Sequence, residues 1–435
     1  MSFLLRITSY ILSWLTYLVF MSINAPLGVT WLPWHLNRLS NSVGYLDENG
    51  FFLHYGFSIW SKCEDCVLTT SEWGDQIYSS VNGLSLFPYW IINSLGGKDA
   101  LLLFGPLLDK LIILLTGALA AELLIKYTNK LSTLPGYFIA FSFFILFITS
   151  PWVYKMLISS WFEIYFLFFL LLGLFSFTKN YLSLGFFFLF ISGIFHPLCA
   201  LSFLGFYILT LVMPVFTKEE NITNSYLPPN ITTFNQKLSL LFSLFFPVLI
   251  FFILRAFLQS DMPQLSGSSL LTRIGISGND VHNGGLLGAL QFLGGNRITI
   301  CLANYSSDLF SSELDNKIMV YNCFLSIGSM LAVSLLSILG LLIFIYKSPE
   351  ARWLIAPLGF SFLLFIAVFQ QSLSVHLMGY SYIFGLLFAT GLCALIMNLS
   401  RYINSINLSI VFSIPLILGI TILSVRISML TGLNG

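Results

Sequence analysis

Charged residues are scarce in this sequence. Only 9% of its 435 residues are Asp, Glu, Lys or Arg, whereas soluble domains carry about 25%. A chain of this composition cannot cover a hydrophobic core with a charged, hydrated surface, which excludes a water-soluble globular protein. The net charge is +1, so the charge balance does not indicate a nucleic acid partner.

The motifs of several familiar enzyme classes are also missing. The chain has no P-loop, GxSxG, HExxH or dinucleotide-binding fingerprint in a supporting context, which argues against an ATP-driven pump. Cys63 and Cys66 form a CxxC pair, but the βαβ pattern of a redox domain is missing. A zinc site would need two more ligands, for which Cys301 and Cys323 are only loose candidates. Disulfides in an oxidising compartment, or free thiols, explain these cysteines better.

Long apolar stretches are abundant. Hydrophobic residues make up 57% of the chain, and the mean hydropathy is +0.89. A membrane-spanning helix needs about 20 mostly apolar residues. The predicted fold is therefore all-α, a single transmembrane domain over residues 1–435 with about eleven transmembrane helices. Their predicted ranges are 8–28, 100–122, 134–150, 157–177, 181–196, 198–216, 238–258, 321–346, 352–370, 375–397 and 406–427.

The positions of Lys and Arg indicate the orientation of the chain. Short cytoplasmic loops are rich in these residues, and this pattern predicts a cytoplasmic N-terminus. Two long loops, 29–99 and 259–320, then lie outside the cytoplasm and are expected to carry short helices in the membrane interface. The sequence shows no internal repeat of the kind found in transporters. We expect a multi-pass integral protein of a bacterial plasma membrane.

Two acidic residues follow the first predicted span closely. Asp47 and Glu48 lie in the stretch GYLDENGFFLHYG, which also contains His54, a candidate substrate ligand. An acid held at the membrane surface can take the proton of a hydroxyl group while a sugar is transferred to that hydroxyl, or it can bind a metal ion. The alternative is an ordinary pair of solvated loop charges, which the spacing alone favours.

Two charged residues lie inside the second predicted span. Placing Asp109 or Lys110 there costs about 2.5–3.5 kcal/mol on insertion scales, so both side chains are predicted to face protein or a water-filled cavity. Lys155 and Glu163 share one face of the fourth predicted span. Pairing of Asp109 with Lys155, or of Lys110 with Glu163, would form either an internal ion pair or a polar cavity that binds phosphate.

Histidines at helix ends and further cations complete the candidate site. His196 precedes Pro197 at the end of the fifth predicted span, and His376 opens the tenth. Either side chain can donate a hydrogen bond to a phosphate or a sugar hydroxyl, although a lone interfacial histidine is more often structural. The candidate cationic partners of a phosphate group are Lys110, Lys155, Arg255 and Arg297.

The pair Asp47-Glu48 with the aromatic residues Phe51 and Phe52 resembles an element of the GT-C superfamily of membrane glycosyltransferases. In that superfamily an early acid in the first outer loop acts as the base. The stretches LFPYWIINSLGGKDALLLFGPLLDK and SPWVYKMLISSWFEIYFLFFLLLGLF resemble the return of that loop and the turn between the third and fourth spans. The resemblance covers about residues 1–180.

One departure from that family concerns the returning loop, which often contains HPP and here has only Phe87-Pro88. The resemblance implies an enzyme that uses a polyprenyl-phosphate-linked sugar. It further implies that Asp47 is the base and that Glu48 or Asp75 supports it.

A second resemblance competes with the first. The stretches WGDQIYSSVNG and FISGIFHPLCALSFLGFYIL resemble the exopolysaccharide and O-antigen polymerases. This resemblance implies functional roles for Asp75, Tyr78 and His196. The two families differ in whether one sugar or a whole repeat unit is moved.

The predicted function is therefore transfer of a sugar from a polyprenyl-phosphate carrier to a glycan, lipid or protein acceptor on the outer face of the membrane. A repeat-unit polymerase and a lipid-linked saccharide transporter are the alternatives. A divalent metal is compatible with this chemistry but is not required by it.

Overall fold

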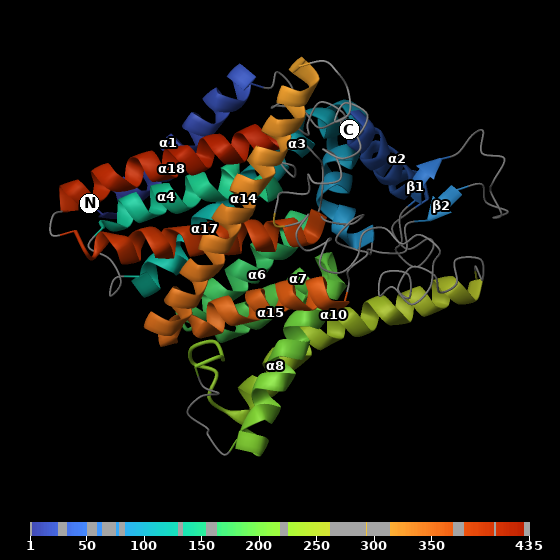
Figure 1. Ribbon diagram of the computed structural model, residues 1–435. Coiled ribbons are helices and arrows are strands. Elements are labelled where there is room, and N and C mark those ends of the chain that lie inside the picture. Colours follow the sequence, from blue (N-terminus) through green and yellow to red (C-terminus); the bar gives the residue numbers. More distant parts are fainter. Residues whose placement is uncertain are drawn as a thin grey trace.

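The computed structural model describes most of the chain as a bundle of helices (Figure 1). The described residues are 2–24, 33–49, 59–62, 75–77, 83–128, 134–153, 163–217, 225–261, 293, 314–368, 378–403 and 406–429. The helices are α1 (Ser2–Asn24), α2 (Pro33–Asn49), α3 (Phe87–Thr128), α4 (Gly136–Thr149), α6 (Glu163–Thr178), α7 (Leu182–Phe195), α8 (Pro197–Thr217), α10 (Phe234–Asp261), α14 (Leu314–Lys347), α15 (Arg352–Val368), α17 (Met378–Ser400) and α18 (Ile406–Met429), with short 3₁₀ turns η2 (Gly83–Leu86) and η5 (Pro349–Ala351).

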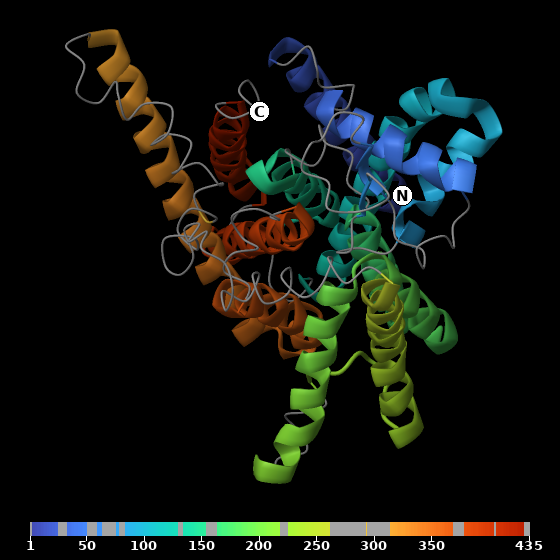
Figure 2. The same ribbon diagram turned by 90° about the vertical axis from the view of Figure 1, so that its right-hand side faces the viewer.

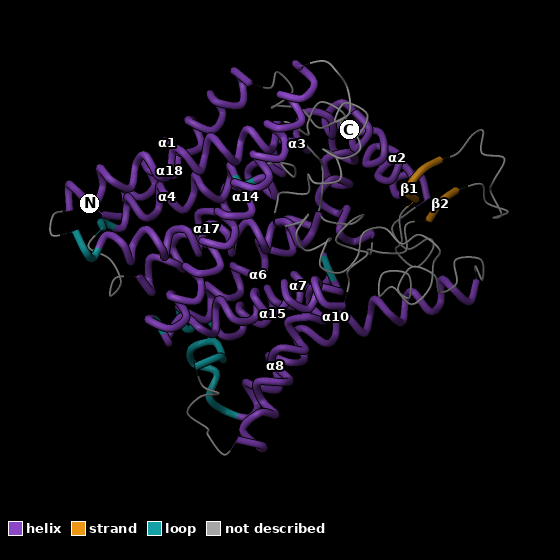
Figure 3. Tube along the Cα trace, viewed as in Figure 1, coloured by secondary structure: helices purple, strands orange, loops and turns teal. Residues whose placement is uncertain are grey.

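The prediction of a helical membrane protein is confirmed, with one small exception. Strands β1 (Ile59–Lys62) and β2 (Asp75–Ile77) form an antiparallel ribbon, shown in orange in Figure 3. The register places Lys62 opposite Asp75. No strand was predicted in this loop.

Helices α4 and α17 form the centre of the bundle. In Figure 1, α18, α4 and α17 run side by side, and α14 crosses them. Helix α4 is buried on nearly all sides, as expected for a helix that is apolar all round. Trp152, just after α4, packs against Phe384 and Phe388 of α17, with ring centroids 4.4 and 5.0 Å apart. These aromatic contacts bind the two central helices together.

Helix α14 can approach α17 only because glycine occupies the crossing point. A Cβ atom added to Gly340 would collide with the backbone carbonyl oxygen of Gly391. Small residues at helix crossings allow the backbones of membrane helices to pack closely. Any side chain at Gly340 would therefore push the two helices apart.

The outer surface of the bundle is apolar. Five helical segments in the described part are long and apolar enough to cross a membrane: Phe87–Tyr127, Phe234–Phe257, Phe324–Lys347, Tyr382–Ser400 and Ile406–Val425. Large side chains such as Leu335, Leu342 and Phe412 are exposed on them. Helices α8 and α10 pack against each other and extend beyond the other helices at one edge of the bundle (Figure 2). A bilayer would cover these surfaces.

Each of the eleven apolar segments predicted from the sequence overlaps a helix in the described part of the chain, although some boundaries were wrong. Five of these helices are long and apolar enough to cross a membrane, and the number of spans stays a prediction. The predicted loop 29–99 ends at residue 86, because α3 begins at Phe87 and not at residue 100. The predicted loop 259–320 overlaps α14, which begins at Leu314. In both places the helix continues beyond its apolar part into polar residues. Helix α2 lies inside the first of these loops, and its location in the membrane interface stays a prediction.

Helix α3 contains a sharp bend at Gly97. This residue has φ +70° and ψ −170°, a conformation that is essentially restricted to glycine. Tyr89 before the bend contacts Asp109 after it, although the two residues are 20 positions apart. In a straight helix they would be about 30 Å apart. The first turns of α3 therefore fold back toward the rest of the helix.

Basic residues gather at the end of the bundle opposite α2. At this end Ser348 donates a hydrogen bond to the carbonyl of Tyr127, and Lys347 donates one to the side chain of Asn398. These contacts bring the ends of α3, α14 and α17 together. The basic side chains at these helix ends are Lys126, Lys179, Lys347, Arg352 and Arg401.

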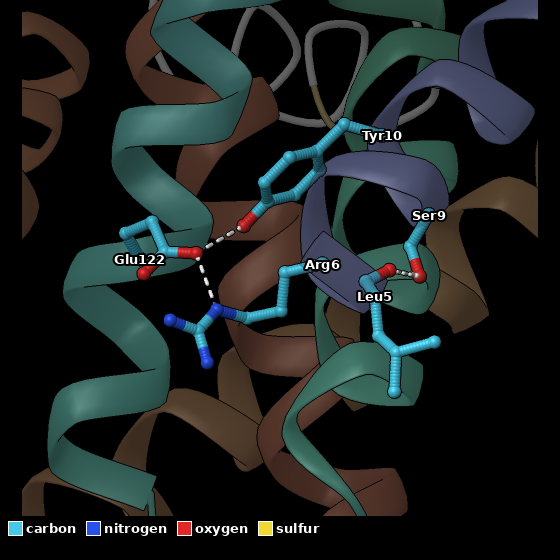
Figure 4. Close-up of polar contacts among 5 residues, drawn as sticks. All are labelled: Leu5, Arg6, Ser9, Tyr10 and Glu122. Carbon is cyan, nitrogen blue, oxygen red and sulfur yellow. Dashed lines mark hydrogen bonds and ion pairs between the residues drawn. The ribbon is translucent and has the colours of Figure 1, made fainter. Parts of the chain in front are cut away.

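Helix α1 is attached to α3 by a small polar cluster within an apolar surrounding (Figure 4). Arg6 Nε and the Tyr10 hydroxyl both donate to Glu122 Oε1, over 2.8 and 2.9 Å. The Arg6 and Glu122 side chains are both largely shielded from solvent. An ion pair in such a position is costly to break, since either charge alone would keep only part of its hydration.

We predict that Glu122→Gln destabilises the protein by about 1–3 kcal/mol, because it removes the negative charge that the Arg6 guanidinium contacts. Gln is nearly the same size, so packing is preserved. The measurement is the apparent melting temperature of the purified protein in detergent. The same substitution at the exposed Glu350 is the control and should have little effect. Equal melting temperatures for the two variants would contradict a structural role for the pair.

Candidate functional site

Helix α2 presents Asp47 to the first turns of α3. Leu39, Val43 and Leu46 are buried and follow the spacing of one helical face. Asp47 lies one turn after Val43 on this face, at the exposed end of the helix. Helix α2 packs against α3 and β1, and the hydrogen bonds of Asp47 show that its side chain is directed toward α3. Glu48 is also exposed, but it is turned by about 100° around the helix.

Two side chains of α3 hold the Asp47 carboxylate. Asn93 Nδ2 donates to Asp47 Oδ2 over 3.3 Å, and Ser94 Oγ donates to Asp47 Oδ1 over 3.1 Å. Each carboxylate oxygen therefore accepts one of these hydrogen bonds and keeps further lone pairs. The result is an oriented, solvent-accessible acid.

The position of this acid is unfavourable for the helix that carries it. Asp47 and Glu48 lie in the last turn of α2, and that turn contains no basic residue. The carbonyl end of a helix carries partial negative charge, which repels carboxylates. Asn93 and Ser94 offset part of this repulsion at Asp47. Neither residue was predicted, because hydrogen bonds between positions more than forty residues apart leave no signal in a single sequence.

Asp75 lies close to this region but is described only as part of the backbone. It begins β2, and β2 pairs with β1, which in turn packs against α2. The third candidate acid is thus at the same end of the molecule as Asp47 and Glu48. Its side chain is outside the described residues, so its proposed supporting role stays a prediction.

A second carboxylate, Asp109, is buried in the bundle. Its side chain is 4% exposed. The Tyr89 hydroxyl donates to its Oδ1 over 2.5 Å, and the Tyr165 hydroxyl of α6 donates to the same oxygen over 3.3 Å. The two tyrosine rings meet edge to face, with centroids 6.0 Å apart. The carboxylate thus has protein donors in place of water.

The expectation that Asp109 and Lys110 face protein is confirmed, because both side chains are buried. The donors found for Asp109 are tyrosines, which the predicted cross-pairs did not include. Lys155 lies outside the described residues, and Glu163 is described only as the first residue of α6. Pairing of either residue with Asp109 or Lys110 therefore stays a prediction.

His196 caps a helix. It lies between α7 and α8, where its Nδ1 accepts a hydrogen bond from the backbone N–H of Cys199 over 3.1 Å. Such a cap satisfies one of the N–H groups that the first turn of a helix leaves unpaired. Because Nδ1 accepts, a neutral imidazole carries its proton on Nε2. The structural role is present, and contact with a substrate stays a hypothesis.

The remaining candidate ligands are less well defined. Arg255 is buried on α10, and its participation in a phosphate site with Lys110 stays a prediction. Within the described residues no three His, Cys, Asp or Glu side chains come together as a metal site. The predicted ligands that lie outside the described part of the chain are His54, Tyr78, Lys155, Arg297 and His376.

Comparison with other proteins adds no further assignment. No protein-family model matches the chain, and no curated protein matches it. The function is therefore argued from the residues and their geometry.

We predict that His196→Asn preserves stability, because an Asn side chain also accepts the hydrogen bond of an N-cap. His196→Ala should lower the free energy of unfolding by about 0.5–2 kcal/mol. Thermal unfolding in detergent compares the two variants. If His196→Asn is as unstable as His196→Ala, the capping role is wrong. A stable His196→Asn protein without activity would indicate that the imidazole also contacts the substrate.

Proposed function

We propose that the protein is a membrane glycosyltransferase. In this proposal it transfers a sugar from a polyprenyl-phosphate carrier to a hydroxyl acceptor on the outer face of the membrane. The main support is the Asp47 carboxylate, which is exposed, oriented by two donors and located at the end of the molecule opposite the basic helix ends. A polyprenyl chain remains in the bilayer while its phosphate reaches the interface, where Asp47 would lie.

The proposed reaction is a displacement at the anomeric carbon of the sugar. The acceptor oxygen forms a bond to that carbon, and the bond from the carbon to the phosphate oxygen breaks. The proton of the acceptor hydroxyl moves to Asp47, which acts as general base. The leaving group is a polyprenyl phosphate, whose negative charge requires cations or a metal ion nearby. The proposed cationic partners are Lys110, Lys155, Arg255 and Arg297.

The proposed topology follows from the distribution of charge. The end that carries Lys126, Lys347 and Arg401 is assigned to the cytoplasm, because cytoplasmic loops are rich in Lys and Arg. Asp47 and the β1–β2 ribbon then lie on the outer side. Eleven spans with a cytoplasmic N-terminus fit this assignment.

Two alternatives remain open. In a repeat-unit polymerase Asp75, Tyr78 and His196 would carry the reaction. A lipid-linked saccharide transporter would move the carrier without breaking the sugar–phosphate bond. Assays of transfer on purified variants distinguish these three functions.

We predict that Asp47→Asn lowers the kcat of sugar transfer by about 10²–10⁴-fold, since the amide cannot accept the proton of the acceptor. Asparagine has one acceptor oxygen in place of two, so it keeps one of the two hydrogen bonds from α3. Because this site is exposed, the melting temperature should change little. The assay follows a radiolabelled sugar from polyprenyl phosphate to an acceptor in detergent micelles.

Asp99→Asn is the matched control, because it makes the same change at an exposed carboxylate of α3 that has no proposed role, and its kcat should stay close to that of the native protein. If Asp47→Asn retains activity while Asp75→Asn has none, the base is Asp75 and the polymerase mechanism is favoured.

The topology is tested by labelling engineered cysteines in a variant without native cysteines. Leu95→Cys and Tyr402→Cys introduce thiols at exposed positions on α3 and next to Arg401. We predict that a membrane-impermeant maleimide labels Leu95→Cys in intact cells and labels Tyr402→Cys only after permeabilisation. The reverse pattern would overturn the orientation and the outer-face location of Asp47.

A further inference from the structure

The first turns of α3 form an arm, defined here as residues 87–96. The arm is separated from the rest of α3 by the bend at Gly97. Residues 94–99 are all exposed, whereas Trp90 and Ile92 pack partly against the core. The start of the arm is therefore held by the bundle while its end is exposed, and glycine at the bend permits the arm to take other directions if that hold is weakened.

The arm contacts both carboxylates described above. Near its start, Tyr89 is fully buried and donates its hydroxyl proton to Asp109. Near its end, Asn93 and Ser94 donate to the two oxygens of Asp47. The buried acid and the exposed acid are therefore connected through about one and a half turns of helix.

We propose that Tyr89 and Asp109 are positioning residues for Asp47. The hydrogen bond between them holds the arm folded against the bundle, and the folded arm presents Asn93 and Ser94 to the Asp47 carboxylate. This inference rests on the proposed role of Asp47 as general base. Neither Tyr89 nor Asp109 contacts the substrate in this mechanism.

The chemistry of the buried site explains why this bond can hold the arm. A carboxylate inside an apolar bundle loses its hydration, and each donor from the protein replaces part of it. If the arm moved away, Asp109 would lose the donor from Tyr89 and keep the longer bond from Tyr165. The arm thus returns to the position in which Asn93 and Ser94 meet Asp47.

Two tyrosines provide a matched pair of variants. Tyr89→Phe and Tyr165→Phe each remove one hydroxyl that donates to the same oxygen of Asp109, and both keep the aromatic ring. Only Tyr89 belongs to the arm, since Tyr165 lies on α6. If Asp109 only stabilises the fold, Tyr89→Phe and Tyr165→Phe should change the mobility of the arm to a similar extent. If Asp109 positions the arm, Tyr89→Phe should change it and Tyr165→Phe should not.

The first measurement is the mobility of a nitroxide spin label at Leu95→Cys, in a variant without native cysteines. Leu95 is 84% exposed on the arm, so a label there should not disturb packing. We expect Tyr89→Phe to increase the mobility of the label and Tyr165→Phe to leave it unchanged. Equal mobility in the two variants, whether low or high, would overturn the proposal.

The second measurement is the kinetics of sugar transfer. We expect Tyr89→Phe to lower kcat by about 10–100-fold with little change in the KM of the lipid donor, because a small displacement of a catalytic group is costly. Tyr165→Phe should retain most of the activity. The double variant Asn93→Ala/Ser94→Ala should also lower kcat, and adding Tyr89→Phe to it should cause little further loss, because all three act through one contact.

The double variant Asn93→Ala/Ser94→Ala also tests the proposal if Tyr89→Phe fails to fold. If Tyr89→Phe does not accumulate in the membrane, the activity of Asn93→Ala/Ser94→Ala is measured in its place. Full activity in that double variant would overturn the proposal. A native protein that transfers no sugar would refute the proposed function, while the spin-label comparison would still establish whether Tyr89 holds the arm.

Discussion

Inside an apolar bundle, every charged or polar group must find its partners within the protein. Water is not available there, and an unpaired carboxylate or guanidinium is costly. Two clusters among the described residues show how this requirement is met, Glu122 with Arg6 and Tyr10, and Asp109 with Tyr89 and Tyr165. Both clusters join segments that are distant in the sequence. The first attaches α1 to α3, and the second attaches the arm to α3 and α6.

Serine and threonine hydroxyl groups also find hydrogen-bond partners within the protein, and many of them do so within their own helix. Many serine and threonine side chains in the helices donate back to the carbonyl one turn earlier, as Ser13, Thr116 and Ser142 do. Such bonds satisfy the hydroxyl without a partner on another helix. The polar contacts that do cross between helices are therefore the ones that determine how the helices are arranged. Ser202 and Ser361, which join α8 to α15 over 2.6 Å, are a further example.

The positions of the helices could be predicted because length and hydropathy are local properties. Each apolar segment became a helix, and the buried state of Asp109 followed from its place within one. The arm could not be predicted, since the stretch NSLGGKD reads as a polar loop and the helix nevertheless continues through most of it. The partners of Asp47 and Asp109 were missed because they come together only after the bend at Gly97. The sequence pattern does not predict the backbone angles of Gly97 that produce this bend.

The two carboxylates that contact the arm have opposite environments, and this difference is the reason that Asp47, and not Asp109, is the proposed base. Asp109 is enclosed by two tyrosines that donate to one oxygen, so an acceptor hydroxyl cannot approach it without displacing the core. Asp47 is exposed, and its two donors lie on a segment that meets the solvent. Glu48 is equally exposed but turned away from the arm. An acid that exchanges protons needs access to its partner as well as a fixed orientation, and Asp47 combines both through contacts that are anchored at Asp109.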